Sequence, residues 1–199
     1  MTSPAVVQQM HAALVRQTGS LADTWDADPY IGLLHARPNG QITVKRLAVP
    51  RRIFAFPDYI TAYTTLAAAV TRADDMPTDL REALRAVNSR THGLVLINEG
   101  WTAPQHLVGE LVRRDAAGGS FPPISTHKIE IRYAHAALFD DLDTVYCYQV
   151  KRDEPTDALF IYSDMPNGTG PAGPLAEAFA ELLTAFAALT SVRDAPSAR

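Results

Sequence analysis

Residues 93–101 read GLVLINEGW, an unbroken aliphatic run that ends abruptly in an amide, a carboxylate and a glycine. Such a run, with glycine at both ends, is typical of a strand that is buried on both faces. It therefore predicts the centre of a sheet, with Asn98 and Glu99 at the point where the strand ends. Ligands commonly bind at that edge in sheets that carry helices on both faces. Asn98, Glu99 and the following Trp101 are thus the first candidates for a functional site.

The remaining patterns predict an α+β fold. Asn39-Gly40 between two strand-like segments is a strong hairpin signal, because this pair readily adopts the positive φ of a tight turn. Short polar turns join the last three strands, which favours an antiparallel meander. We expect a mostly antiparallel sheet of about six strands packed by about five helices. The strands are expected at 30–37, 41–49, 93–97, 127–138, 143–152 and 157–163, and the helices at 4–17, 57–73, 77–90, 103–114 and 174–190.

Length and composition indicate one domain. A chain of 199 residues with 47% hydrophobic residues can bury a single core, which we place at residues 1–190, followed by a frayed polar tail at 191–199. The start of the chain lacks the pattern of a signal peptide, and no apolar run approaches the length of a membrane span. We therefore expect a soluble, cytoplasmic protein that does not interact with membranes.

Charge and cysteine content argue against nucleic-acid binding and against a zinc site built on several cysteines. The net charge of −4 makes nucleic acid an unlikely partner, although the cluster of Lys45, Arg46, Arg51 and Arg52 could contact one, or an acidic protein. Cys147 is the only cysteine, so an intramolecular disulfide and a zinc site built on several thiolates are excluded. We interpret Cys147 as an inert buried thiol.

Glu99 is the leading catalytic candidate. A partly buried carboxylate could act as a general base or a metal ligand. The alternatives are that Glu99 pairs with an arginine at the sheet edge, or that it faces water where the strand ends. His106 and Glu110 share a face of the next expected helix and could assist Glu99, although that face could equally be solvated. The loop at 115–126 could flank Glu99 as a lid or binding loop.

The strand at 127–138 alternates in charge on one face. Lys128, Glu130 and Arg132 predict an exposed ladder, or alternatively a polar binding surface. His127 and His135 lie eight residues apart, roughly 26 Å along a strand, which is too far for them to bind one zinc ion.

Three further motifs are interpreted as local structure. Residues 168–173 match G-x-G-x-x-G, but no second parallel strand can follow, so a flexible connector is expected. The aspartates at 23, 26 and 28 around Trp25, and those at 140, 141 and 143, are interpreted as solvated turns.

The segment Asn98-Glu99-Gly100-Trp101, followed by Pro123-Ile124-Ser125-Thr126-His127, resembles small uncharacterised bacterial or phage proteins. That resemblance covers under a quarter of the chain and implies no activity.

Two functions follow as hypotheses. The first is a non-catalytic binding or interaction module that acts through a protein partner or a second copy of itself. The alternative is a hydrolase-like or metal-dependent enzyme with a pocket at Asn98 and Glu99. Its tentative catalytic residues are Glu99 and His106, and its tentative binding residues are Asn98, Trp101, Glu110, Lys128, Glu130 and Arg132. No cofactor or metal is assigned.

Overall fold

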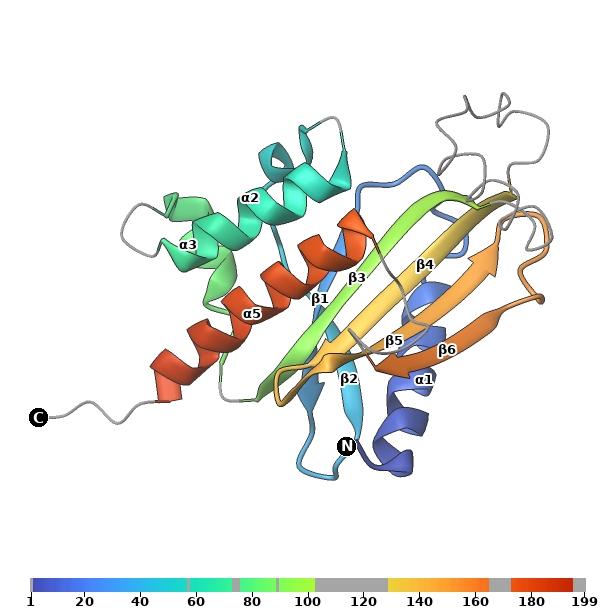
Figure 1. The fold of residues 1–199 in the computed structure, drawn as a ribbon, viewed down its shortest axis with the longest axis horizontal. Coiled ribbons are helices and arrows are strands. Elements are labelled where there is room, and N and C mark those ends of the chain that lie inside the picture. The colour runs from blue at the N-terminus through green and yellow to red at the C-terminus, as the bar shows by residue number, and fades with distance from the viewer. Residues whose placement is uncertain are drawn as a thin grey trace, which may run out of the picture.

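The computed structural model describes residues 2–56, 58–72, 76–88, 90–102, 129–164 and 173–194. These residues form one six-stranded antiparallel sheet in the order β2-β1-β3-β4-β5-β6 (Figure 1). The strands are β1 (Tyr30–Ala36), β2 (Ile42–Arg46), β3 (Thr91–Thr102), β4 (Ile129–Leu138), β5 (Asp141–Lys151) and β6 (Leu159–Asp164).

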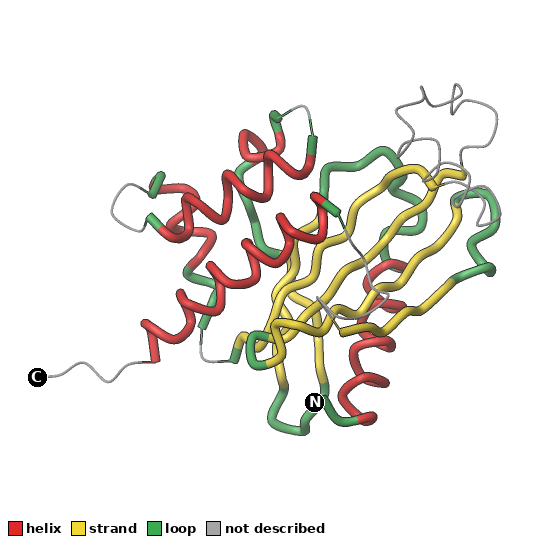
Figure 2. Tube along the Cα trace, viewed as in Figure 1, coloured by secondary structure: helices red, strands yellow, loops and turns green. Residues whose placement is uncertain are grey.

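Helices cover both faces of this sheet. One helix lies on one face and three lie on the other, so that the sheet is the middle layer (Figure 2). The helix on the first face is α1 (Pro4–Gly19), and those on the second are α2 (Tyr59–Thr71), α3 (Thr78–Leu84) and α5 (Pro174–Asp194). A short 3₁₀ helix, η1 (Arg51–Phe54), connects β2 to α2.

Local chemistry explains where the helices begin. The Ser3 hydroxyl accepts a hydrogen bond from the backbone N–H of Val6, and Pro4 occupies the first turn of α1, where a missing N–H costs nothing. The Asp58 carboxylate caps α2 by accepting from the backbone N–H of Thr61 at 2.7 Å. Both caps satisfy a donor that a helix start leaves unpaired.

Strand β3 separates two apolar cores. Leu94 and Leu96 face α2 and α5, whereas Val95 and Ile97 face α1. Alternate residues of a strand point to opposite faces, and all four side chains are buried because helices cover both faces. The uninterrupted apolar run at 94–97 is therefore explained by a central strand with helices on both sides.

The α+β prediction is confirmed, with small differences in detail. The described residues contain four α-helices, and the fifth expected helix, at 103–114, lies outside them. Helix α3 ends at Leu84, earlier than expected, and α5 continues to Asp194 into the segment expected to be a tail. The predicted connector at 168–173 lies outside the described residues except for Gly173. None of the described helices is long and apolar enough to cross a membrane.

One predicted boundary is wrong in a way that matters for the site. Strand β3 does not end at Asn98 but continues to Thr102, because β4 pairs with it as far as Thr102. On its other side, pairing with β1 stops at Ile97, opposite Tyr30. Asn98 and Glu99 therefore lie inside a strand, yet next to an open edge on the β1 side.

Candidate functional site

Glu99 is bound on both of its carboxylate oxygens. It lies on the α1 face of β3, where Arg132 of β4 is its partner in the register. Arg132 Nη2 donates to Glu99 Oε1 at 2.6 Å, and the backbone N–H of Asp26 donates to Glu99 Oε2 at 2.7 Å. The side chains of Glu99 and Arg132 are only 15% and 3% exposed. The pairing alternative considered from the sequence is therefore the one that the structure contains.

Trp25 and Arg132 attach the segment between α1 and β1 to the sheet. The Arg132 guanidinium lies 4.3 Å from the centroid of the Trp25 ring, and that of Arg152 lies 5.3 Å from it. Arg132 Nη1 also donates to the backbone carbonyl of Leu21. These cation–π and hydrogen-bond contacts position Asp26, which has a φ of 65°. Aspartate tolerates this left-handed conformation better than most residues do.

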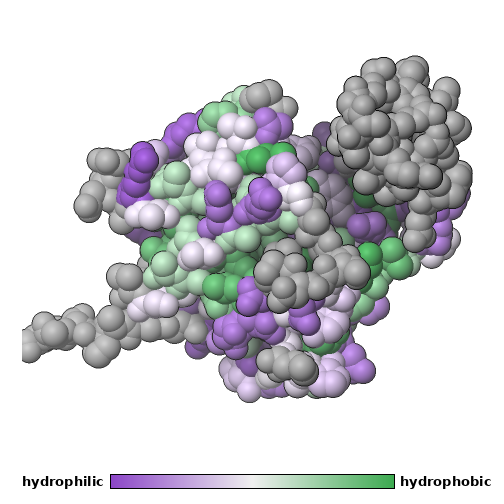
Figure 3. Space-filling view, in the orientation of Figure 1, coloured by the Kyte–Doolittle hydropathy of each residue, from purple (hydrophilic) through white to green (hydrophobic). Residues whose placement is uncertain are grey.

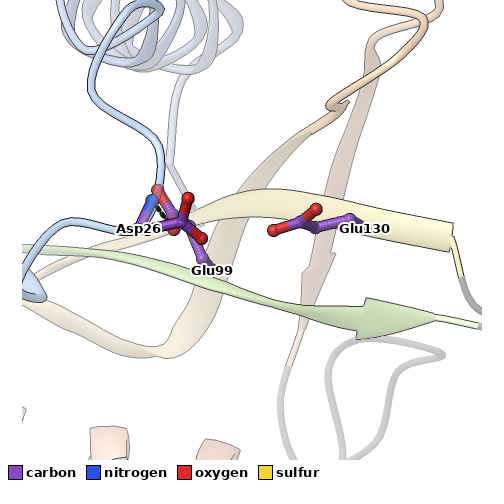
Figure 4. Close-up of side chains that lie close together, drawn as sticks. All are labelled: Asp26, Glu99 and Glu130. Carbon is purple, nitrogen blue, oxygen red and sulfur yellow. Dashed lines mark hydrogen bonds between the residues drawn. The ribbon is translucent and has the colours of Figure 1, made fainter.

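Three carboxylates converge beside Trp25. Asp26, Glu99 and Glu130 each have an oxygen within 4.8 Å of the others, and in Figure 4 they point toward one another from a loop and two neighbouring strands. Arg152 connects two of them, with contacts of 3.1 Å to Asp26 and 3.0 Å to Glu130. We name the five charged residues Asp26, Glu99, Glu130, Arg132 and Arg152 the charge clamp.

The charge clamp is built to hold a loop on a sheet. Its two guanidinium groups neutralise two of its three negative charges and occupy oxygens that a cation would need. A divalent ion prefers carboxylate oxygens without competing positive charge, and it would have to displace Arg132 or Arg152. The geometry therefore favours loop anchoring over metal binding.

A cavity of about 420 Å³ opens at the unpaired edge of β3 next to the charge clamp. Its volume is within the range usual for small-molecule sites. Its lining includes Glu99 and Arg132 of the charge clamp together with Tyr30, Arg46 and Arg51. The remaining lining residues are Leu21, Thr24, Asp26, Ala27, Asp28, Ile97 and Asn98.

Asn98 belongs to a different hydrogen-bond group from Glu99, because adjacent strand residues face opposite ways. Its Oδ1 accepts a hydrogen bond from the hydroxyl of Tyr63 on α2. Burial raises the pKa of Tyr63 well above its usual value, so this phenol remains a donor. The Asn98 amide nitrogen is buried without an acceptor among the described residues.

Of the predicted site residues, the structure brings Glu99, Glu130 and Arg132 together in the charge clamp, but Trp101 is not part of it. Trp101 is 58% exposed and does not line the cavity beside Glu99. Arg132 is buried, which corrects the predicted exposed ladder, and Glu130 is half-buried in the charge clamp. His106, Glu110, Lys128 and the expected loop at 115–126 lie outside the described residues.

The roles of Trp25, Asp26 and Arg152 were not predicted from the sequence. The aspartates around Trp25 were visible, but their pattern is also that of a solvated turn, and nothing local connects them to Arg152. A tryptophan among acidic residues was the one local signal of a binding or anchoring role for this segment. Its two arginine partners, Arg132 in β4 and Arg152 directly after β5, lie more than a hundred residues further along the chain.

The structure also shows what surrounds Cys147 and the residues of the basic cluster. Burial raises the pKa of the Cys147 thiol to about 11, and its described polar contact is a hydrogen bond from Gln149 at 3.5 Å, which supports the interpretation as an inert thiol. In the basic cluster, Arg51 pairs with Asp28 and Arg52 pairs with Asp79.

No protein-family model matches this chain, and no curated protein or solved structure matches it either.

Proposed function

We propose that this protein is a non-catalytic interaction module that binds a second copy of itself through the face formed by α2 and α5. The observation that carries the proposal is an open hollow of about 700 Å³ between these two helices. Its lining is dominated by small side chains, namely Thr64, Ala67, Ala68, Thr71, Ala180, Thr184, Ala185 and Ala188, together with Arg72 and Glu181.

The surface chemistry of this face supports docking of another protein. Pale and green colours predominate over α2 and α5 in Figure 3, which indicates few strongly hydrophilic side chains. The large apolar side chains of α5 are not available for this purpose. Phe179, Leu182, Leu183 and Phe186 are completely buried against the sheet and α2. A partner would therefore contact the opposite face of α5, where alanine and threonine permit close approach of a helix.

The charges favour a second copy as the occupant. Helices α2 and α5 run side by side in the same direction (Figure 1). Glu181 lies toward the beginning of the hollow and Arg72 toward its end, about 10 Å apart along the helix axes at the usual rise per residue. A two-fold axis through the centre of the hollow would pair Glu181 of each copy with Arg72 of the other. An interface of this kind is self-complementary.

Charge reversal tests this arrangement. Glu181→Arg and Arg72→Glu should each convert a dimer to monomer, and the double variant should restore the dimer because the reciprocal pairs are rebuilt with opposite sign. Sedimentation velocity across a wide range of protein concentration would measure the distribution. Glu177→Arg is the matched control, since Glu177 is exposed on the same helix but does not line the hollow.

A wild-type protein that stays monomeric at all concentrations would refute the proposal. So would single reversals that dimerise as well as the wild type does.

The alternative is a hydrolase-like or metal-dependent enzyme, and it places Glu99 as a base or a ligand. The cavity beside Glu99 favours it, but both Glu99 oxygens already accept hydrogen bonds, from Arg132 and Asp26. Catalysis would require one of these bonds to break first. If a metal or substrate binds through Glu99, its stabilising effect on thermal unfolding should vanish in Glu99→Gln.

A further inference from the structure

A second cavity adjoins the one beside Glu99. It has a volume of about 270 Å³ and is lined by apolar side chains that include Ile31, Leu47, Val49 and Phe54. Three charged residues line both cavities, namely Asp28, Arg46 and Arg51. The chain therefore places two guanidinium groups and one carboxylate where a polar cavity meets an apolar one.

Arg46 has no carboxylate partner among the described residues. Its guanidinium lies 5.4 Å from the centroid of the Tyr30 ring. Burial raises the pKa of Tyr30 to about 12, so the phenol is neutral and does not neutralise Arg46. The Arg46 donors are therefore available to an acceptor that enters from either cavity.

Arg51 uses only one of its guanidinium nitrogens in the described contacts. Its Nε contacts Asp28 at 3.2 Å, and its side chain is 92% exposed. The two terminal nitrogens of its guanidinium make no hydrogen bond to the other described residues. Two guanidinium groups against one carboxylate leave a net positive charge at the junction of the cavities. A guanidinium offers donors in a planar fork that matches the oxygens of a carboxylate.

We propose that this junction binds a small organic carboxylate. The carboxylate group lies between Arg46 and Arg51, and the apolar body occupies the cavity lined by Ile31, Leu47, Val49 and Phe54. That cavity is slightly smaller than the range usual for ligand sites, so it can hold only a short alkyl chain or a single ring. This site shares no lining residue with the α2–α5 face, so either proposal can be wrong without affecting the other.

Hexanoate is a suitable probe, and its titration into the wild-type protein can be followed by NMR at constant ionic strength. We expect saturable binding. Hexanol should bind at least about tenfold more weakly because it lacks the charge. Acetate should also bind more weakly, because each methylene removed from the body lowers the affinity about fourfold. Inorganic phosphate tests the head group alone and should be a poor competitor.

Two matched pairs of variants locate the site. Arg46→Gln and Arg51→Gln should each lower hexanoate affinity by about tenfold or more, since each removes a charge-assisted hydrogen bond. Lys45→Gln and Arg52→Gln remove the same charge from the neighbouring residues, which line neither cavity, and should leave affinity unchanged.

Three results would overturn the inference. The first is the absence of saturable hexanoate binding. The second is binding of acetate or phosphate as tight as that of hexanoate, which would exclude an apolar site for the body. The third is an equal loss of affinity in Lys45→Gln and Arg46→Gln, which would show general electrostatic attraction instead of a defined site.

Discussion

At the scale of single residues, Glu99 and Arg132 form the most buried ion pair in the described part of the chain. Burial removes both ions from water, and their mutual attraction only partly compensates for that loss. Removing one partner leaves the other charge buried and unpaired, which costs more than the pair contributes. The consequence is a site that tolerates loss of both charges better than loss of one.

Glu99→Gln should therefore lower the free energy of unfolding by about 3 kcal/mol, measured by urea denaturation. Combining it with Arg132→Met should recover part of that loss, because the unpaired guanidinium is removed as well. Arg152→Gln is the control, since Arg152 is more exposed and should change stability much less. A double variant that loses the sum of both single effects would contradict this account.

At the scale of secondary-structure elements, the approach of β3 to β4 depends on Gly93. A Cβ at this position would lie 2.1 Å from the backbone carbonyl oxygen of Ala137, and a backbone atom cannot move aside as the end of a side chain can. Gly19, the last residue of α1, has no atom within 4 Å of the corresponding position. A side chain at position 93 would therefore clash with β4, whereas position 19 has room for one.

We expect Gly93→Ala to separate or distort the β3–β4 pair and to lower the thermal unfolding midpoint strongly. Overpacking of this kind costs about 1–3 kcal/mol, or more where the neighbour is backbone. Gly19→Ala should be neutral or slightly stabilising, because alanine loses less conformational freedom in a helix. Circular dichroism melting of both variants would check this, and equal midpoints would refute it.

At the scale of the whole molecule, stability should depend on pH through His135. This side chain is buried between β4 and α5, and burial lowers its pKa from 6.5 to about 4. Between these two values the unfolded chain binds the proton and the folded protein does not. The stabilisation is complete above pH 6.5 and is lost as the pH falls toward 4. Burial also lowers the pKa of His35, which acts in the same direction.

The free energy of unfolding should thus fall by about 2 kcal/mol between pH 7 and pH 4.5 because of His135 alone. Several carboxylates titrate in the same range, so the decisive comparison is with His135→Leu, whose stability should depend less on pH. Urea denaturation of both proteins at the two pH values measures the difference. Parallel pH profiles would show that His135 does not contribute.

Local sequence patterns were sufficient to predict the class of fold and most elements of the described residues. The apolar run at 94–97, the Asn39-Gly40 turn and the apolar spacing in α5 are local patterns, and local periodicity is sufficient to distinguish strands, turns and helices. The central position of β3 followed from the same reasoning, because only a strand covered on both faces has so few polar residues. Element ends were less certain, since β3 extends to Thr102 only because β4 pairs with it.

The contacts of the charged residues depend on the packing of segments that are distant in the sequence. Glu99 was identifiable as a candidate, but its partner Arg132 is 33 residues away and is set by the register of β3 with β4. Asp26 and Arg152 are 126 residues apart, and they meet where the Trp25 ring lies against the guanidinium groups of Arg132 and Arg152. Contacts of this kind have no local pattern, because an ion pair depends on distance in space and not on spacing along the chain.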